Sequence, residues 1–197
     1  MPSIRDQKLL YHLTCRDNLG SILESGLLPR NSLPSGGFDD IADPEIICSR
    51  SRMELADYVP FHFFARNPFD GNVQTSSSNT GKRFILIAVR RDMAQANGWK
   101  IIPRHPLAFP EPKIMDYDDG MNTIDWDAME KRDYQEAHSK SVCMAECLSP
   151  SVVPVEKFFS IYVKDENDQE YVQQFKDMRK AAFHININAG MFNTSET

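Results

Sequence analysis

The segment RFILIAVR, residues 83–90, constrains the fold more than any other stretch of the sequence. Its apolar residues follow one another without a polar interruption, which is typical of a strand buried on both faces. Such a strand needs a core on each side of its sheet. A chain of 197 residues, 41% of them hydrophobic and 25% charged, is sufficient for one domain of this kind. We therefore predict a single domain over residues 1–197, with 184–197 as a loosely ordered tail.

Shorter patterns predict the elements around this segment. Further strands are expected at 9–14, 59–64, 142–148 and 158–164, and helices after Asp17, over 125–138 and after Asn167. Asp17 is the expected N-cap of the first helix and Gly26 its end, while Asn167 and Glu170 resemble a capping box. The proline-rich stretch 103–112 is too broken for regular structure. Because strands and helices do not alternate regularly, the predicted class is α+β.

The charge balance is acidic, with a formal net charge of −6. This counts against broad, non-specific binding of nucleic acid, which usually requires a basic surplus. Basic residues nevertheless cluster at 49–52, 81–83, 89–91 and 176–180. A local cationic groove on an acidic protein is therefore compatible with the sequence.

The four cysteines form no CxxC pair, so we expect reduced, buried thiols and no metal site. No apolar stretch approaches the roughly 18–20 residues that a transmembrane helix needs. The N-terminus lacks the apolar region of a signal peptide. The expected location is the cytoplasm, without membrane attachment.

His12 and Thr14 share one face of the predicted strand 9–14, because side chains alternate along a strand. Two polar groups ahead of a short helix suit the hydroxyl and amide groups of a nucleotide. From His12 alone, a histidine satisfied by the backbone is the more common interpretation. Arg50 and Arg52 form a fork suited to a diphosphate, although isolated arginines are usually solvated.

Aromatic residues are dense in DYVPFHFFARNPF, residues 57–69. Phe61 and Phe63 are expected on one face of this strand, where they could stack on nicotinamide or a nucleobase, although aromatics at strand spacing more often form core. Glu146 is a carboxylate inside the otherwise apolar CMAECL. Burying it is costly unless it is paired or used in catalysis, for instance to stabilise positive charge as a glycosidic bond breaks.

Taken in order, five blocks resemble the DarT family of bacterial DNA ADP-ribosyltransferase toxins. They are YHLT-x-x-DNL-x-x-IL-x-x-GLL, SRSR, DYVPFHFFARNPF, IDW and MAECL, and they extend from Leu10 to about Tyr162. The resemblance implies an ADP-ribosyltransferase fold in which two small antiparallel sheets flank an NAD cleft, with helices around them. It also implies NAD as co-substrate, single-stranded DNA as acceptor and a macrodomain antitoxin as partner.

The resemblance implies roles for individual residues. It assigns His12 and Thr14 to NAD contact and Asn18 to the shape of the pocket. The catalytic arginine aligns with Arg50, or with its competitor Arg52 if the loop register shifts by two, and the catalytic glutamate aligns with Glu146.

We expect Arg52 and Arg66 to contact the DNA. Two features depart from the family pattern: His62 replaces an aromatic residue, and the acidic, proline-rich stretch 100–124 differs from the segment associated with DNA contact.

Other functions compete with this interpretation. The His-x-Thr block and the GL-x-P turn are also similar to NAD-dependent RNA 2′-phosphotransferases, although the VPFHF block and Glu146 argue against that family. An ADP-ribosyltransferase that acts on RNA or protein is a second rival. A nucleotide-binding module without catalysis is a third. The sequence contains no GxGxxG, Walker, HExxH or nucleophile-elbow motif to support dehydrogenase, P-loop or peptidase chemistry.

Overall fold

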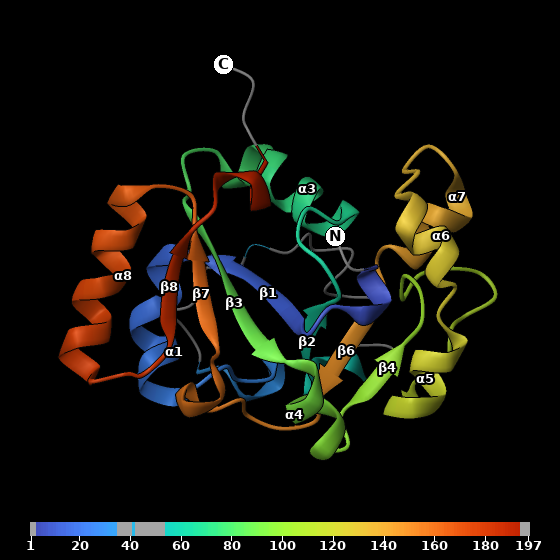
Figure 1. Ribbon diagram of the computed structural model, residues 1–197, viewed down its shortest axis with the longest axis horizontal. Helices are drawn as coiled ribbons and strands as arrows, with labels where there is room; N and C mark the ends of the chain where they lie inside the picture. The colour runs from blue at the N-terminus through green and yellow to red at the C-terminus, as the bar shows by residue number, and fades with distance from the viewer. Residues whose placement is uncertain (1–2, 35–40, 42–53, 194–197) are drawn as a thin grey trace.

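The computed structural model describes residues 3–34, 41 and 54–193, and its backbone is a mixture of strands and short helices (Figure 1). The strands are β1 (Leu9–Cys15), β2 (Val59–His62), β3 (Phe84–Arg90), β4 (Lys100–Ile102), β5 (Met115–Asp116), β6 (Glu146–Ser149), β7 (Ser160–Val163) and β8 (His184–Ile187). The helices are α1 (Leu19–Ser25), α3 (Pro68–Thr75), α4 (Arg91–Ala96), α5 (Tyr117–Thr123), α6 (Trp126–Lys131), α7 (Ala137–Val142) and α8 (Glu166–Arg179). The predicted α+β class is confirmed.

The described strands form one sheet in the order β5-β4-β6-β2-β1-β3-β7-β8. Neighbours pair antiparallel except β7 and β8, which are parallel. The expectation of two separate small sheets was therefore wrong. The reason is the pairing of Tyr11 with His62, through which β1 joins β2 while it also pairs with β3 along its whole length.

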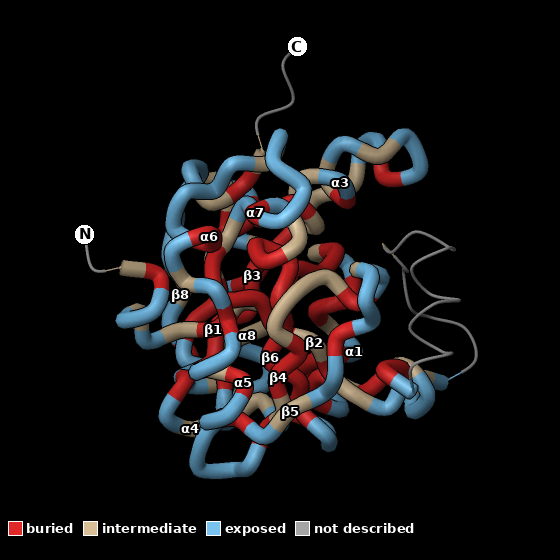
Figure 2. Tube along the Cα trace, turned by 90° about the vertical axis from the view of Figure 1, so that its right-hand side faces the viewer, coloured by how far each residue is buried: buried red, intermediate tan, exposed pale blue. Residues whose placement is uncertain are grey.

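The strand β3 lies at the centre of the core, as its apolar run predicts. Ile85, Ile87 and Val89 belong to one hydrophobic cluster, and Leu86 belongs to a second cluster with Leu13. Alternate side chains therefore enter opposite layers, which explains why every position from 84 to 89 is buried. Figure 2 shows the buried residues gathered along the strands and the exposed ones on the outer loops and helices.

Local predictions were wrong at the helix ends. Asp17 does not cap α1: Asn18 occupies the N-cap position, after a 3₁₀ turn at Arg16–Asn18. The last helix begins at Glu166, and its cap is Asp165, whose carboxylate accepts the Asp168 N–H at 3.1 Å. The N-cap therefore lies two residues before the Asn167 that the sequence suggested. Both errors arise because several polar residues in a row satisfy the same capping pattern.

Three longer predictions also differ from the structure. The helix expected over 125–138 is divided into α6 and α7, because Arg132 adopts a left-handed conformation with φ of 50°. The strand expected over 142–148 starts only at Glu146, since Val142 still ends α7. The tail expected at 184–197 contains β8, whose residues pair with β7 from Ser160 to Val163. Gly26 ends α1 as predicted, with φ of 79°.

Candidate active site

A cavity of about 180 Å³ opens between α1 and the central strands β1, β2 and β6. Its walls are largely apolar, and a few polar side chains enter it, which is the usual composition of a small-molecule site. The polar residues that line it are His12, Thr14, Ser21, Ser25, Arg30, Tyr58, His62, His105 and Glu146. Three of the residues singled out from the sequence are thus brought to one cavity: His12, Thr14 and Glu146.

The C-terminal end of α1 closes one side of this cavity. Gly26 lines the wall, and a Cβ at this position would lie 2.7 Å from the Val153 carbonyl oxygen. Leu27 pairs with Val153 directly afterwards, with N–O distances of 2.9 Å in both directions. Glycine is therefore required both by the positive φ and by this close approach of two backbones.

The His12 ring is oriented by a backbone contact. Its Nδ1 lies 2.8 Å from the Pro60 carbonyl oxygen, and a carbonyl can only accept, so Nδ1 carries a proton. In the neutral ring Nε2 is then a hydrogen-bond acceptor. The ring also packs against Phe61, with centroids 5.6 Å apart. A histidine held in this way offers a fixed ring edge to a ligand.

Thr14 and Asn18 form a buried polar pair at the start of α1. The Asn18 side-chain amide donates to Thr14 Oγ1 at 3.3 Å, and both side chains are buried. The Asn18 carbonyl accepts from the Ser21 hydroxyl at 2.9 Å. Thr14 and Ser21 line the cavity, whereas Asn18 lies behind them. The pair therefore ties β1 to α1 directly beneath the cavity wall.

Glu146 enters the cavity from the first position of β6. It is only 6% exposed and sits opposite His62 in the β2–β6 register. His62 Nδ1 lies 3.2 Å from the Ala145 carbonyl oxygen, and its ring stacks on Phe69 at 5.3 Å. A buried carboxylate in a largely apolar wall suits the stabilisation of developing positive charge, because electrostatic interactions are stronger in surroundings of low dielectric constant.

The structure does not bring Phe61 and Phe63 into the cavity. Phe61 packs against Trp99 at 5.1 Å and Phe63 against Trp126 at 5.4 Å, and both rings are buried in the core. The alternation along this strand was predicted, but the other face, with Pro60 and His62, lines the cavity. The signal that could have identified it was His62, a polar residue in an otherwise apolar strand.

Of the predicted arginines, the structure describes only Arg66. Arg50 and Arg52 are outside the described residues. Arg66 is exposed and does not line the cavity. Its backbone is held in a left-handed turn with φ of 60°, where its N–H donates to Asp70 Oδ2 and its carbonyl accepts the Tyr134 hydroxyl, both at 2.9 Å. Arg30 and His105, which line the cavity, were not predicted, because they lie in irregular segments without a pattern.

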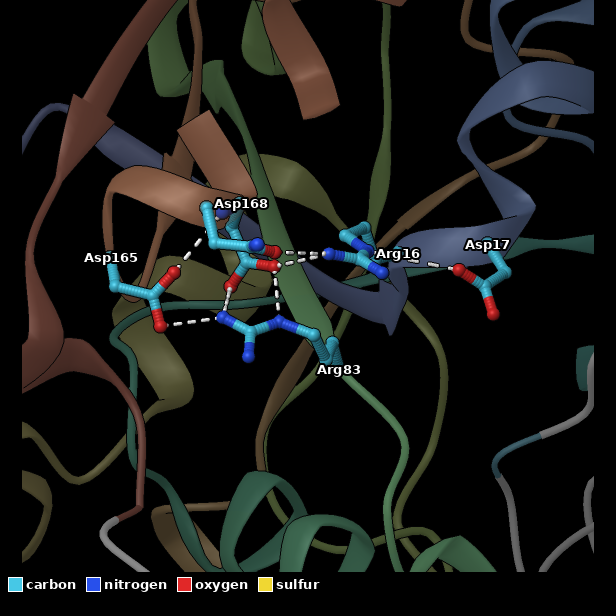
Figure 3. Close-up of polar contacts among 6 residues, drawn as sticks. Arg16, Asp17, Arg83, Asp165 and Asp168 are labelled. Atoms are coloured by element: carbon cyan, nitrogen blue, oxygen red, sulfur yellow. Dashed lines mark hydrogen bonds and ion pairs between the residues drawn. The ribbon is translucent and has the colours of Figure 1, made fainter. Parts of the chain in front are cut away.

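Arginines from two of the basic clusters, 81–83 and 89–91, make contacts within the fold. Arg83 donates to Asp168 at 2.5 and 2.8 Å and to Asp165 at 2.5 Å, and Arg16 donates to Asp168 at 3.0 Å (Figure 3). Hydrogen bonds from Arg83 to Asp168 raise the pKa of Arg83 further above its usual value. The buried Arg91 guanidinium donates to four backbone carbonyls, among them Ile4 at 2.9 Å and Phe63 at 2.9 Å. These arginines are therefore committed to internal contacts rather than to a cationic groove.

No group of three or more His, Cys, Asp or Glu residues within the described ranges could hold a metal ion. Cys15, Cys143 and Cys147 are buried free thiols, and burial raises the pKa of Cys143 to about 11. In the part of the chain that the structure describes, helices are too short or too polar to cross a lipid bilayer.

Comparison with known proteins identifies the family. Residues 11–193 match the sequence model of the family described as "ssDNA thymidine ADP-ribosyltransferase, DarT". The chain belongs to the DarT family. The match includes all of α1, β2, β6 and β8, so the DarT family relationship covers the cavity and both ends of the sheet.

Known relatives support this DarT assignment at low sequence identity. The DNA ADP-ribosyl transferase of Escherichia coli O127:H6 (strain E2348/69 / EPEC) is 22% identical over 209 residues, with 96% of each chain covered. The DarT of Thermus sp. 2.9, solved in complex with ADP-ribosylated ssDNA, matches with a TM-score of 0.83 and 20% identity over 94% of this chain and 96% of that chain. The same Thermus protein with NAD⁺ gives 0.79 and 19%, over 95% and 98%.

A further structural match is DarTG of Thermosipho africanus in complex with ADP-ribose. Its TM-score is 0.70 at 22% identity, and the alignment covers 94% of this chain and 51% of that chain. The structural matches confirm the predicted ADP-ribosyltransferase fold. The family match also decides against the RNA 2′-phosphotransferases that share the His-x-Thr block.

Proposed function

We propose that this chain transfers ADP-ribose from NAD to a thymine base in single-stranded DNA. The observation that carries the proposal is the convergence of His12 and Thr14 from β1 with Glu146 from β6 on one cavity, in a chain whose family match spans residues 11–193. Relatives of the same fold have been solved with NAD⁺ and with ADP-ribosylated ssDNA, which supports the same pair of substrates here.

The residues present fit the nicotinamide-riboside end of NAD. Apolar walls such as Leu27 and Pro60 suit a flat aromatic ring, while Thr14, Ser21 and the oriented His12 offer hydrogen-bonding groups for an amide or ribose hydroxyls. NAD supplies a ribose carbon whose bond to nicotinamide breaks with development of positive charge. Arg50 is the proposed contact for the phosphates or the acceptor base. Arg50 and the nearby Arg52 lie outside the described residues.

Glu146 is the proposed catalytic residue. Its carboxylate would stabilise the positive charge that develops at ribose C1 as the bond to nicotinamide breaks. The bond that forms joins C1 to N3 of thymine, the ring nitrogen that does not already carry deoxyribose. The N3 proton leaves to Glu146 or to solvent. Because N3 takes part in Watson–Crick pairing, the base must be unpaired, and single-stranded DNA is the expected acceptor.

The test is mass spectrometry of short oligonucleotides after incubation with the protein and NAD. A single-stranded oligonucleotide that contains one thymidine should gain one ADP-ribose, while the same sequence without thymidine and the matching duplex should gain none. If nicotinamide is released only when RNA or protein is present, the acceptor is a macromolecule of that class instead of DNA. If no acceptor causes release of nicotinamide, the chain is a nucleotide-binding module without catalysis.

We also propose a cytoplasmic site of action and toxicity to the cell, because NAD and single-stranded DNA are both present there. A macrodomain antitoxin that removes ADP-ribose is the proposed partner. The match to DarTG, of which this chain covers 51%, supports such a pairing. Co-expression with a macrodomain hydrolase should restore growth and remove the DNA adduct, whereas a catalytically inactive hydrolase should not.

A further inference from the structure

The loop between β4 and β5, residues 103–114, carries the most exposed large apolar side chain of the described residues. Phe109 is 97% exposed, so its ring contacts almost nothing in this chain. Leu107 and Ile114 in the same loop are 47% and 37% exposed. Burial of a phenylalanine ring usually stabilises a fold, and the exposed Phe109 makes no such contribution. The ring is therefore available to something outside the chain.

Hydrogen bonds hold this loop in one shape. The Arg104 guanidinium donates to the Pro110 carbonyl at 2.6 Å, and the Ala108 N–H donates to the His105 carbonyl at 2.9 Å. The His105 N–H donates to the Ser141 carbonyl at 2.8 Å, which anchors the loop beside α7. Prolines at 103, 106, 110 and 112 further limit the backbone. Phe109 is thus presented from a fixed turn.

The loop also forms part of the rim of the catalytic cavity. His105, Pro106 and Leu107 line it, and Phe109 follows two residues later, which is at most about 7 Å of chain. Arg104 and Lys113 lie on either side of Phe109 in the sequence, and Glu111 is the single acidic residue of the loop. An exposed aromatic ring with flanking cations beside a catalytic cavity is the combination that binds single-stranded nucleic acid through stacking.

We propose that Phe109 stacks on the nucleobase next to the thymidine that enters the cavity, and that Arg104 and Lys113 attract the adjoining phosphates. This inference rests on the proposed function and adds to it a residue that positions the acceptor strand. Stacking on a benzene ring tolerates any base, because every base has a π-face. The loop therefore selects an unpaired strand rather than a sequence, and it holds the acceptor base at the entrance to the cavity.

Binding measurements test this proposal independently of catalysis. Fluorescence anisotropy of a labelled oligonucleotide with one thymidine should show affinity on the order of ten-fold weaker for Phe109→Ala than for the wild type, since stacking of one base is worth about 1–3 kcal/mol. Phe109→Trp should restore the affinity. Met178→Ala is the matched control, because Met178 is also exposed, at 67%, but lies on α8 at the opposite end of the sheet (Figure 1).

Abasic oligonucleotides then locate the contact. Each position next to the thymidine is replaced in turn by an abasic site. One replacement should weaken wild-type binding about ten-fold and leave Phe109→Ala binding unchanged, because the stacking pair is already lost. Equal affinity of Phe109→Ala and wild type, or equal losses for both proteins at every position, overturns the stacking proposal. Failure of the wild type to form any adduct while it binds DNA overturns the proposed function instead.

Discussion

Two groups of buried or half-buried polar side chains lie next to β1, and they differ in what surrounds them. The pocket group, His12, Thr14 and Glu146, lines a cavity, and the His12 Nδ1 contacts the Pro60 carbonyl oxygen. The arginine–aspartate cluster, Arg16, Arg83, Asp165 and Asp168, faces α8 and pairs charge with opposite charge (Figure 3). Ion pairs in the cluster join α8 to the residues next to β1 and β3, whereas the pocket group lines the cavity. Burial of polar residues therefore indicates function only where a cavity accompanies it.

The largest expected effect concerns the pocket group. Glu146→Gln keeps the size of the side chain but removes its charge, so ADP-ribosylation of the oligonucleotide should fall by about 100- to 1,000-fold. Thermal unfolding should change little, because glutamine fits the same buried position. Mass spectrometry of the adduct gives the rate, and calorimetry gives the stability. Near wild-type transfer by this variant would exclude Glu146 as the catalytic carboxylate.

The second effect concerns the arginine–aspartate cluster. Asp168→Asn leaves Arg16 and Arg83 without their shared carboxylate, and the free energy of unfolding should fall by about 2–3 kcal/mol. This is less than for a fully buried pair, since Arg83 is 36% exposed and can regain water. The kcat of the folded protein should stay unchanged. Urea unfolding measures the loss.

Glu24→Gln is the matched control for that loss. Glu24 pairs with Arg179 between α1 and α8, with both side chains well exposed. Surface pairs of this kind contribute about 1 kcal/mol or less. An equal loss for Asp168→Asn and Glu24→Gln would show that the cluster is no more than a surface ion pair.

A pH-dependent effect concerns Asp70, a buried carboxyl that belongs to neither group. Its Oδ2 accepts the Arg66 N–H, while Oδ1 is buried without a hydrogen-bond partner among the described residues. Burial raises the pKa of Asp70 to about 7. The unfolded chain ionises this group near pH 4, so its stabilising contribution is complete below pH 4 and is lost as the pH rises to about 7.

The wild type should therefore lose more unfolding free energy than Asp70→Asn between pH 4 and pH 8, by up to about 4 kcal/mol, since one pKa unit is worth about 1.4 kcal/mol. Urea unfolding at a series of pH values measures both curves. Parallel curves for the two proteins would show that Asp70 does not titrate differently in the folded and unfolded states.

Much of the fold was predictable because it depends on local patterns. The apolar run of β3, the strand before α1 and the glycine that ends α1 each follow from a few neighbouring residues. The helix ends were less predictable, since Asp17 and Asn18, or Asp165 and Asn167, satisfy the same capping pattern. Only the backbone geometry around Arg132 divides the helix predicted over 125–138.

The candidate site was predictable in part. His12, Thr14 and Glu146 could be singled out because each is a polar residue in an apolar strand. Phe61 and Phe63 were assigned to the ligand because alternation indicates that two faces exist but not which face is covered. Arg30 and His105 could not be found, since their position at the cavity depends on the course of irregular chain.

The sequence by itself determined the mixed class of the fold, its buried central strand and the polar residues suited to nucleotide chemistry, because these depend on residue type and short-range periodicity. Only the tertiary structure decided that the strands form one sheet, that Pro60 and His62 line the cavity, and that Arg16 and Arg83 form ion pairs with Asp168. Those outcomes depend on pairing between strands and helices far apart in the chain. The pairing of Tyr11 with His62, for example, cannot be recognised from the residues of β1 or of β2 alone.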